Sequence, residues 1–569
     1  MDRFFLAALV REVRPRLQGL KAWGLSPWGR SGFAIALSAR SPKSIVVSLL
    51  PVASGFFLGT PQSRSPHRKL PVRMSKLIVG SELVDVRASP LDRTVLFEWR
   101  RSRPSGVQEH LELVVEWFGT RSAAFLVELE TRKILDVYSL STPRRILGET
   151  YEPLTPPSGA TLAIDSARSF MERWTAARRE GLGERQAVRL AGGLSPNLAE
   201  DVWMLHVQGG IALDAAFETV LEKSTDEPHP ILIAPSGSFR DQRSRYRTSL
   251  VSLSYRSKWE TSFQTFNEAA QSYLSYATRL ALARRQYQAL GTVLRRKLKK
   301  HRLLLEKVDG DRKRLEDPQL LRRRGELLLA GLSSAKKTGS EVIVPDPYSP
   351  EGALVRVPID PRRSIVQNAD RYFERSRRVE RGVKKLEART NLLTDELRHL
   401  ETLELSLENT SDPEDLAALA GEMEAEGLMP RAENGRAGES GELVGPRRIS
   451  GVGGCEILVG RSARSNEKLT FEAATADDLW FHAVGVAGAH VLLRTPPGRE
   501  VREEQVHQAA GVAAYYSKAR GSTSVEVMYT SRKNVRKIRK APPGTVRVTR
   551  FNSVRVRPAL PDGKSDKDK

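Results

Sequence analysis

Two long segments in which apolar residues recur at alternating spacings of four and three constrain this chain most. In the second segment the positions are Val379, Val383, Leu386, Thr390, Leu393, Leu397 and Leu400. In the first they are Tyr273, Tyr276, Leu280, Ala283, Tyr287, Leu290, Leu294, Leu304 and Val308. This spacing aligns one apolar stripe along an α-helix and is typical of a coiled-coil seam. Lys297 and His301 interrupt the first stripe, so we expect weaker packing there.

The segment between the two stripes predicts a small domain. It holds a helical stretch at 320–332 and two strand-like runs within 341–360. The runs are separated by the turn-forming sequence PDPYSPEG, which favours antiparallel strands. The simplest architecture is a helix going out, a tip domain at about 311–362 and a helix coming back. Residues 264–410 are therefore predicted to form a long antiparallel coiled-coil arm.

The residues before the arm predict two domains. Residues 1–155 combine a helix at 4–17 with strand-like runs at 33–39, 44–50, 94–99 and 111–118, which indicates an α+β domain. Residues 160–260 contain short helices separated by glycine. In these, Ser195 and Pro196 fit an N-cap followed by proline at the first helical position. Compact helical hairpins of this kind can present backbone N–H groups to phosphates, although an ordinary helical connector has the same pattern.

The residues after the arm predict three further parts. Residues 411–445 are acidic and then rich in glycine and alanine, so we interpret them as a linker. A second α+β domain is expected at 446–560, followed by a disordered tail at 561–569. The predicted fold class is therefore a multidomain α+β protein.

Composition favours a polyanionic partner. The 569 residues include 91 Lys and Arg and 68 Asp and Glu, which gives a formal net charge of +23. Nucleic acid is the first candidate and an anionic membrane surface the second. A single cysteine excludes an intramolecular disulfide framework, and Arg11 and Glu12 break the N-terminal apolar run. The most apolar stretch, at 44–59, holds Pro51 and Gly55 and is too short to span a bilayer, so a soluble, cytoplasmic protein is expected.

Conventional catalytic patterns are absent from the sequence. There is no G-x-x-x-x-G-K-[ST] loop, no H-E-x-x-H and no G-x-S-x-G. Cys455 has the features of a buried structural thiol rather than a nucleophile. His482 and His490 lie eight residues apart on strand-like segments, but metal binding needs further ligands that the sequence does not supply. We therefore expect no catalytic residues, no metal and no cofactor.

The clearest physical signal for function lies near the C-terminus. From Val527 to Pro561 there is no acidic residue. The basic residues of this segment are Arg532, Lys533, Arg536, Lys537, Arg539, Lys540, Arg547, Arg550, Arg555 and Arg557. A solvated face normally carries both signs of charge, so this run predicts contact with a nucleic-acid backbone. Pro542, Pro543 and Gly544 favour a loop or a short helix there. Neighbouring aromatic residues could stack on bases, although core packing is the more usual role of most of them.

Several segments, in order along the chain, resemble the NFACT family, whose members include ribosome quality-control factors and proteins known as fibronectin-binding proteins. They are DRFFLAALVREVRPRL, SPLDRTVLFEW, GLSPNLAE, RRGELLLAGL, PDPYSPEG, QNADRYFERSRR and DDLWFHAVGVAGAHVLLRT followed by AAYYSKARGSTSVEVMYTSRKNVRK. GLSPNLAE is similar to the family's helix-hairpin-helix signature, and the last pair is similar to its RNA-binding domain. Residues 41–75 match poorly, and Arg3 stands where the family usually has glycine.

This resemblance implies a function and a set of site residues. Bacterial members bind large ribosomal subunits carrying stalled peptidyl-tRNA, recruit alanyl-tRNA and support mRNA-independent addition of C-terminal alanine tails. The family's Asp-Arg motif, needed for tRNA handling and tailing, falls on Asp92 and Arg93, and an aspartate acting with it falls on Asp2. The likeness to the RNA-binding domain adds Trp480, His482, Lys518 and Arg520 to the basic residues as candidate RNA contacts. Expected partners are the large subunit with its rRNA, and tRNA.

Other functions stay open at this point. The protein could be a fibronectin-binding surface adhesin, although the sequence shows no secretion signal. It could also bind RNA or tRNA without supporting tailing. The family's N-terminal fold also resembles DNA glycosylases that use an N-terminal proline, but residue 2 is aspartate here, so that chemistry is not expected.

Overall fold

The structure, a computed structural model, divides the chain into two compact units, Met1–Arg285 and Gln286–Lys569. It describes residues 1–561 except 30, 38–42, 62–69, 91, 104, 140, 142–145, 154–165, 192–193, 195, 227, 235–245, 250–259, 334–335, 348, 350–352, 411, 431–444, 495–499 and 540. Ser195, Lys540 and most of the predicted tail therefore lie outside the described residues.

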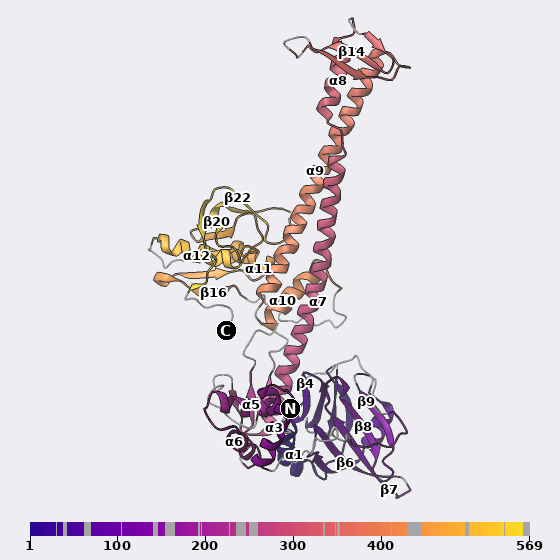
Figure 1. The fold of residues 1–569 in the computed structure, drawn as a ribbon, viewed down its shortest axis with the longest axis vertical. Coiled ribbons are helices and arrows are strands. Elements are labelled where there is room, and N and C mark those ends of the chain that lie inside the picture. The colour runs from indigo at the N-terminus through magenta and orange to yellow at the C-terminus, as the bar shows by residue number, and fades with distance from the viewer. Residues whose placement is uncertain are drawn as a thin grey trace. The chain divides into compact units, whose positions relative to one another are not determined.

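The first unit contains two antiparallel sheets in which strands adjacent in sequence are also adjacent in space (Figure 1). The four strands of the first sheet are β1 (Gly24–Trp28), β2 (Gly32–Ala36), β3 (Ser44–Leu50) and β4 (Ala53–Gly59). The five strands of the second are β5 (Glu82–Ala88), β6 (Thr94–Ser102), β7 (Gln108–Glu116), β8 (Ala123–Glu128) and β9 (Ile134–Ser139). β2, β3, β6 and β7 lie where the sequence predicts strands.

One hydrophobic core joins these two sheets. Phe56 of β4 packs edge-to-face on Phe97 of β6, with ring centroids 5.5 Å apart, and stacks on Trp117. The Trp117 indole N–H donates to the Ser48 carbonyl of β3 at 2.7 Å, so the polar end of this buried ring is satisfied. These contacts fix the face of the second sheet against the first.

Helix α1 (Arg3–Leu17) covers an edge of this core. Phe5, Leu9 and Val13 recur every four residues and are fully buried, which is the inward stripe of an amphipathic helix. The helix begins at Asp2, whose carboxylate accepts a hydrogen bond from the Phe5 N–H at 2.9 Å. A short helix, α2 (Val72–Ile78), follows the first sheet.

Four helices and three short strands complete the first unit. The helices are α3 (Ala167–Arg179), α4 (Glu184–Ala191), α5 (Pro196–Val207) and α6 (Leu213–Thr225), and the strands are β10 (Ile231–Ile233), β11 (Arg247–Ser249) and β12 (Glu260–Ser262). Phe170 of α3 stacks on Phe217 of α6 with ring centroids 4.2 Å apart, which joins the first and last of these helices. The helical character expected for this region is present.

The second unit is built around two long helices, α7 (Phe266–Lys313), which begins in the first unit, and α9 (Ile365–Asn409). The two helices run antiparallel, because the partner on α9 moves back along the chain as the residue on α7 moves forward. His301 contacts Glu396 at 3.1 Å, and Arg312 contacts Glu387 at 3.9 Å. Leu393 and Leu400, on the predicted stripe, are buried. His301 thus fills its place in the stripe with a polar contact rather than an apolar one.

A small sheet lies between the two long helices in sequence and packs on the intervening helix and on the start of α9 (Figure 1). Helix α8 (Pro318–Ala330) is followed by strands β13 (Lys336–Thr338), β14 (Glu341–Pro345) and β15 (Leu354–Pro358). β14 and β15 pair antiparallel, as the intervening turn sequence predicts. The Asn368 side chain of α9 donates to the Asp360 carbonyl at 3.0 Å and so fixes the return of the chain into α9.

The C-terminal part of the second unit is a six-stranded antiparallel sheet in the order β16-β17-β19-β18-β20-β23. The strands are β16 (Arg447–Ser450), β17 (Glu456–Val459), β18 (Leu479–Ala483), β19 (Val491–Arg494), β20 (Val525–Ser531) and β23 (Asn552–Val556). Helix α12 (Glu503–Tyr515) covers one face. Helix α11 (Ala463–Lys468), a π-helical turn at Leu469–Ala473 and a hairpin of β21 (Val535–Lys537) and β22 (Val546–Val548) cover the other.

The segment predicted as a linker contains helix α10 (Pro413–Ala425). The linker prediction is therefore wrong for these residues. Leu416 and Met423 are fully buried, and Asp415 forms a 2.6 Å ion pair with Arg461 of the C-terminal sheet domain. Acidic composition suggested a solvated tether, whereas the helix uses its acids to hold the next domain.

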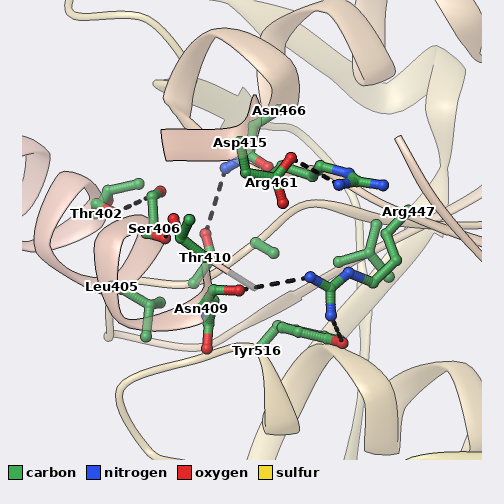
Figure 2. Close-up of a pocket in the computed structure, with 14 residues that line it drawn as sticks. Thr402, Leu405, Ser406, Asn409, Thr410, Asp415, Arg447, Arg461, Asn466 and Tyr516 are labelled. Carbon is green, nitrogen blue, oxygen red and sulfur yellow. Dashed lines mark hydrogen bonds and ion pairs between the residues drawn. The ribbon is translucent and has the colours of Figure 1, made fainter. Parts of the chain in front are cut away.

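Figure 2 shows how the C-terminal domain is held against α9 and α10. Arg447 donates to the Tyr516 hydroxyl at 2.7 Å and to the Asn409 carbonyl, at the end of α9, at 3.5 Å. Thr402 and Asn466 line the same small pocket. This junction is polar, and charged groups rather than a large apolar interface set its geometry.

Candidate nucleic-acid interface

The first unit brings together the three residues implied by the Asp-Arg motif. Asp2 caps α1, and Asp92 and Arg93 lie in the turn between β5 and β6. The three are electrostatic neighbours, because both Asp2 and Asp92 act on the Arg93 guanidinium. Residues separated by 90 positions in sequence thus form one charged cluster at the start of α1.

Burial and acidic neighbours act in opposite directions on the pKa of Arg93. Burial lowers this pKa below its ordinary value, and Tyr273 of α7, Asp2 and Asp92 offset this shift only in part. Burial also lowers the pKa of the Met1 α-amino group, to about 5, and the amine donates to the Ser54 carbonyl at 3.1 Å. The guanidinium therefore stands in a partly dehydrated site where its interaction with an anion is stronger than in water.

The Asp92 carboxylate has unused hydrogen-bonding capacity. Its Oδ1 atom is buried and has no hydrogen-bond partner among the described residues. A buried acceptor without a donor costs roughly 1–3 kcal/mol, so it is retained in folded proteins for a reason other than stability. This oxygen is therefore free to accept a hydrogen bond from a ligand.

Two members of this cluster were missed in the sequence. Arg3 donates from Nη1 to the Pro90 carbonyl at 2.7 Å and so fixes the turn that carries Asp92. Tyr273 lies on α7, far away in the chain. No local pattern could have assigned Tyr273, because its spacing fits the apolar stripe of that helix.

A second candidate interface is the outer face of the β21–β22 hairpin. Arg536 lies directly opposite Arg547 in the antiparallel pair, and both side chains are exposed. Like charges directly opposite each other destabilise a sheet. Lys533, Arg539 and Arg550 are also exposed nearby in the chain. The hairpin therefore presents a repulsive cluster of cations, which an anionic partner relieves.

The structure corrects the interpretation of several predicted RNA contacts. Trp480 is 1 % exposed and belongs to the core between sheet and hairpin, so it cannot offer an open face to a base. Lys518 forms ion pairs with Glu404 at 2.8 Å and Glu401 at 3.6 Å, both on α9. Lys518 thus fastens the domain to the helix.

Three further basic residues also have internal partners. The Arg520 guanidinium stacks 3.7 Å above the Tyr515 ring. Arg532 donates to the Thr470 carbonyl at 2.9 Å. Lys537 pairs with Glu467 at 2.6 Å but stays largely exposed. Among the predicted RNA contacts, Lys533, Arg536 and Arg539 are exposed, as are Arg547, Arg550, Arg555 and Arg557 of the same basic run, and Lys540 lies outside the described residues.

His482 and His490 lie close together, with ring centroids 5.6 Å apart. Burial lowers the pKa of both, to about 3 for His490. His490 is held by the Thr470 hydroxyl at 2.8 Å from Nδ1. No group of three or more His, Cys, Asp or Glu residues within the described ranges is arranged to hold a metal ion. In the same part of the chain, no helix is both long and apolar enough to cross a membrane.

The fold defines a multidomain α+β protein whose C-terminal domain carries an exposed cationic hairpin. A family model described as the NFACT N-terminal and middle domains matches residues 2–440, and one for the NFACT protein RNA binding domain matches residues 450–550. The chain therefore belongs to the NFACT family.

Curated relatives cover most of the chain. A Bacillus subtilis protein named Rqc2 homolog RqcH is 25% identical over 85% of this chain and 84% of its own length. A Streptococcus suis protein of the same name is 26% identical over 98% of each chain. The solved C-terminal part of a fibronectin/fibrinogen-binding protein from Streptococcus suis aligns with a TM-score of 0.38 and 24% identity, over 49% of this chain and 95% of that one.

Proposed function

We propose that the protein is a ribosome quality-control factor that binds large ribosomal subunits and tRNA. The observation that carries this proposal is the match to both NFACT family models, which together cover residues 2–440 and 450–550. Relatives named Rqc2 homolog RqcH extend over nearly the whole chain. A formal net charge of +23 suits a partner built of phosphates.

The hairpin cations are assigned to rRNA. Arg536 and Arg547 stand opposite each other without an acidic residue between them, and phosphate groups relieve their repulsion. Such contacts are independent of sequence and strongly dependent on salt. They suit a domain that positions the protein on a large RNA.

The cluster at the start of α1 is assigned to tRNA. Arg93 offers a planar fork of donors that matches a phosphate. Asp92 has a buried oxygen ready to accept a hydrogen bond from a base or a ribose. By its resemblance to bacterial NFACT proteins, the protein recruits alanyl-tRNA and supports alanine tailing of peptidyl-tRNA on stalled subunits.

In this proposal the ribosome makes the peptide bond, so the protein is a cytoplasmic elongation-type factor and not an enzyme. Helices α3–α6 act as a helix-hairpin-helix module. Helices α7 and α9 form a coiled-coil arm with α8 and β13–β15 as its tip. The long helices supply reach across the subunit surface.

The experiment is the double substitution Asp92→Ala with Arg93→Ala. We expect the variant to sediment with large subunits, to lose co-purifying tRNA and to add no C-terminal tails to a stalled reporter peptide. Its thermal midpoint should stay close to that of the unchanged protein, and thermal unfolding checks that the variant is folded.

A matched control removes an acid and an arginine elsewhere on the same unit. Glu109→Ala with Arg103→Ala breaks a surface ion pair between β7 and the preceding turn. This control should keep tRNA, subunits and tailing. Normal tailing by the Asp92/Arg93 variant would leave a generic RNA-binding protein, and fibronectin binding without subunit binding would favour an adhesin.

A further inference from the structure

A pocket between the C-terminal half of α9 and the sheet of the C-terminal domain is distinct from both clusters described above. Its volume is about 460 Å³, within the range that holds small ligands. Part of its wall comes from α9, part from β18 and β20, and part from the turn and second strand of the β21–β22 hairpin. Both sides of the pocket belong to the second unit.

The pocket is lined by flat and apolar groups. Trp480 forms the buried floor of the pocket. The His482 ring stacks on the Trp480 ring, with ring centroids 5.8 Å apart and an angle of 9° between the ring planes. Met528, Val546 and Val548 add apolar surface, and Phe551, 54 % exposed, lies at the rim. A lining of this kind suits a planar, largely uncharged ligand.

The electrostatics of the lining favour the same ligand. Burial lowers the pKa of His482 and His490, so both rings are neutral at physiological pH. Among the described lining residues, Arg398 of α9 is the one arginine, and it pairs with Asp395 of the same helix at 3.5 Å with its side chain 66 % exposed. Arg550, next to Phe551 in the chain, is exposed.

The hairpin connects the pocket to the proposed phosphate contacts. Val546 and Val548 line the pocket, whereas Arg547 between them is exposed. Successive residues of a strand face opposite sides, so one strand contributes both a pocket wall and a phosphate-binding cation. Gly485 also lines the pocket, and a Cβ atom placed at this position would meet no atom within 4 Å. The backbone of Gly485 therefore borders open space.

We propose that this pocket binds one unstacked nucleobase of an RNA whose phosphates lie on the β21–β22 hairpin. The inference rests on the proposed RNA-binding function and adds base recognition to phosphate binding. The base stacks against His482 and Phe551, and its edge lies toward α9, where Asp395 is the only acid among the described lining residues. A target with a flipped-out or single-stranded base is therefore preferred over a regular duplex.

The test uses the full-length protein and two short single-stranded RNAs, one unmodified and one with abasic sugars but the same phosphates. Stacking of one base contributes roughly 1–3 kcal/mol, so the unmodified RNA should bind roughly five- to 150-fold more tightly. Phe551→Ala should reduce this preference severalfold and leave the salt dependence unchanged. Leu303→Ala, which removes an equally exposed side chain on α7, should leave the preference intact.

The experiment distinguishes failure of the base-pocket proposal from failure of the proposed RNA-binding function. Equal binding of both RNAs by the unchanged protein, or an undiminished preference in the Phe551→Ala variant, would overturn the base pocket while phosphate binding stands. If neither RNA bound, the proposed RNA-binding function itself would be overturned. Because Phe551 is exposed, its truncation is not expected to unfold the domain, and the thermal midpoint checks this directly.

Discussion

Asp2 has a structural contact that can be separated from its proposed role at the tRNA site. It is 5 % exposed, and its carboxylate caps α1 through the Phe5 N–H at 2.9 Å. Asp2→Ala should destabilise the first unit by roughly 0.5–2 kcal/mol, whereas Asp2→Ser keeps a capping oxygen and should cost much less. Thermal or denaturant unfolding of the two variants measures this difference.

The same two variants report on the charge of Asp2. If the carboxylate acts with Asp92 and Arg93, both variants lose tRNA although only Asp2→Ala loses stability. If Asp2→Ser instead keeps tRNA and tailing, the residue serves α1 alone. The serine variant therefore distinguishes a binding role from a capping role at one position.

His490 should make the C-terminal domain sensitive to acid. Burial lowers its pKa in the folded protein to about 3, against an ordinary value of 6.5. A neutral buried histidine stabilises the fold fully above about pH 6.5, and this contribution is lost as the pH falls toward 3, because the unfolded chain binds the proton first. We expect the protection factors of amides in β18 and β19, which correct for the pH dependence of intrinsic exchange, to fall between pH 6.5 and 5.

Substitution of the histidine tests this assignment. His490→Gln should be less stable at pH 7 but should lose less stability on acidification than the unchanged protein. His507→Gln, at an exposed position on α12, is the matched control and should leave the pH dependence unaltered. A pH dependence that is the same with and without His490 would contradict the prediction.

Some residues could not be assigned from the sequence because burial is a property of the fold. Trp480, an aromatic residue in a domain rich in basic segments, was expected to contact RNA. It is instead a core residue, because the π-helical turn at Leu469–Ala473 and the β21–β22 hairpin cover its face of the sheet. Lys518 is indistinguishable in sequence from Lys533. Only the fold places Glu401 and Glu404 beside Lys518 and leaves Lys533 exposed.

At the scale of elements, the β21–β22 hairpin combines strain with proposed function. Arg536→Ala with Arg547→Ala removes a like-charge cross-strand pair, so the isolated protein should become equally or slightly more stable, by about 0.2–1 kcal/mol. The same variant should bind RNA more weakly, and its salt slope should fall by roughly 0.7–0.9 for each phosphate that it no longer neutralises. Salt titrations of RNA binding give the slope.

A charge control keeps this prediction specific. Arg448→Ala removes an exposed arginine that pairs with Glu456 at 2.7 Å between β16 and β17. It lowers the net charge without touching the hairpin and should change the slope little. An unaltered slope in the Arg536/Arg547 variant would show that the hairpin is a solvated surface.

The long helix α9 provides a second prediction at this scale. Leu393 is 1 % exposed in the middle of the helix, and Leu393→Pro should cost about 3 kcal/mol or more by removing a backbone hydrogen bond and kinking the helix. We expect loss of association with large subunits while binding of isolated tRNA survives. Leu393→Met, which keeps the volume, should preserve both. Persistent subunit association with a demonstrably broken helix would exclude a role for the arm in docking.

The periodic elements were predictable and the irregular ones were not. The four–three spacing predicted α7 and α9 because it extends over many turns. In the basic C-terminal run, Pro542, Pro543 and Gly544 favoured a loop or a short helix, but the chain around them forms a hairpin. The informative signal was the alternation of valine and arginine in VRK and VRV on either side of Pro542–Gly544, which has the period of a strand.

At the scale of the whole molecule, the two proposed RNA-binding sites lie on different compact units. Asp2, Asp92 and Arg93 belong to residues 1–285, and the hairpin belongs to residues 286–569. Each unit has its own hydrophobic core, so removal of one site should not unfold the other. The two proposed activities should therefore be separable by substitution, whereas the proposed tailing activity should require both.

The two double variants should accordingly fail in different ways and should not rescue each other. Asp92→Ala with Arg93→Ala should lose tRNA and keep subunits, and Arg536→Ala with Arg547→Ala should weaken subunit binding and keep tRNA. If one molecule must hold tRNA and subunit together, a mixture of the two variants adds no tails to a stalled reporter. Tailing by the mixture would show that the two sites act in separate molecules, which would contradict a single factor that joins tRNA to the subunit.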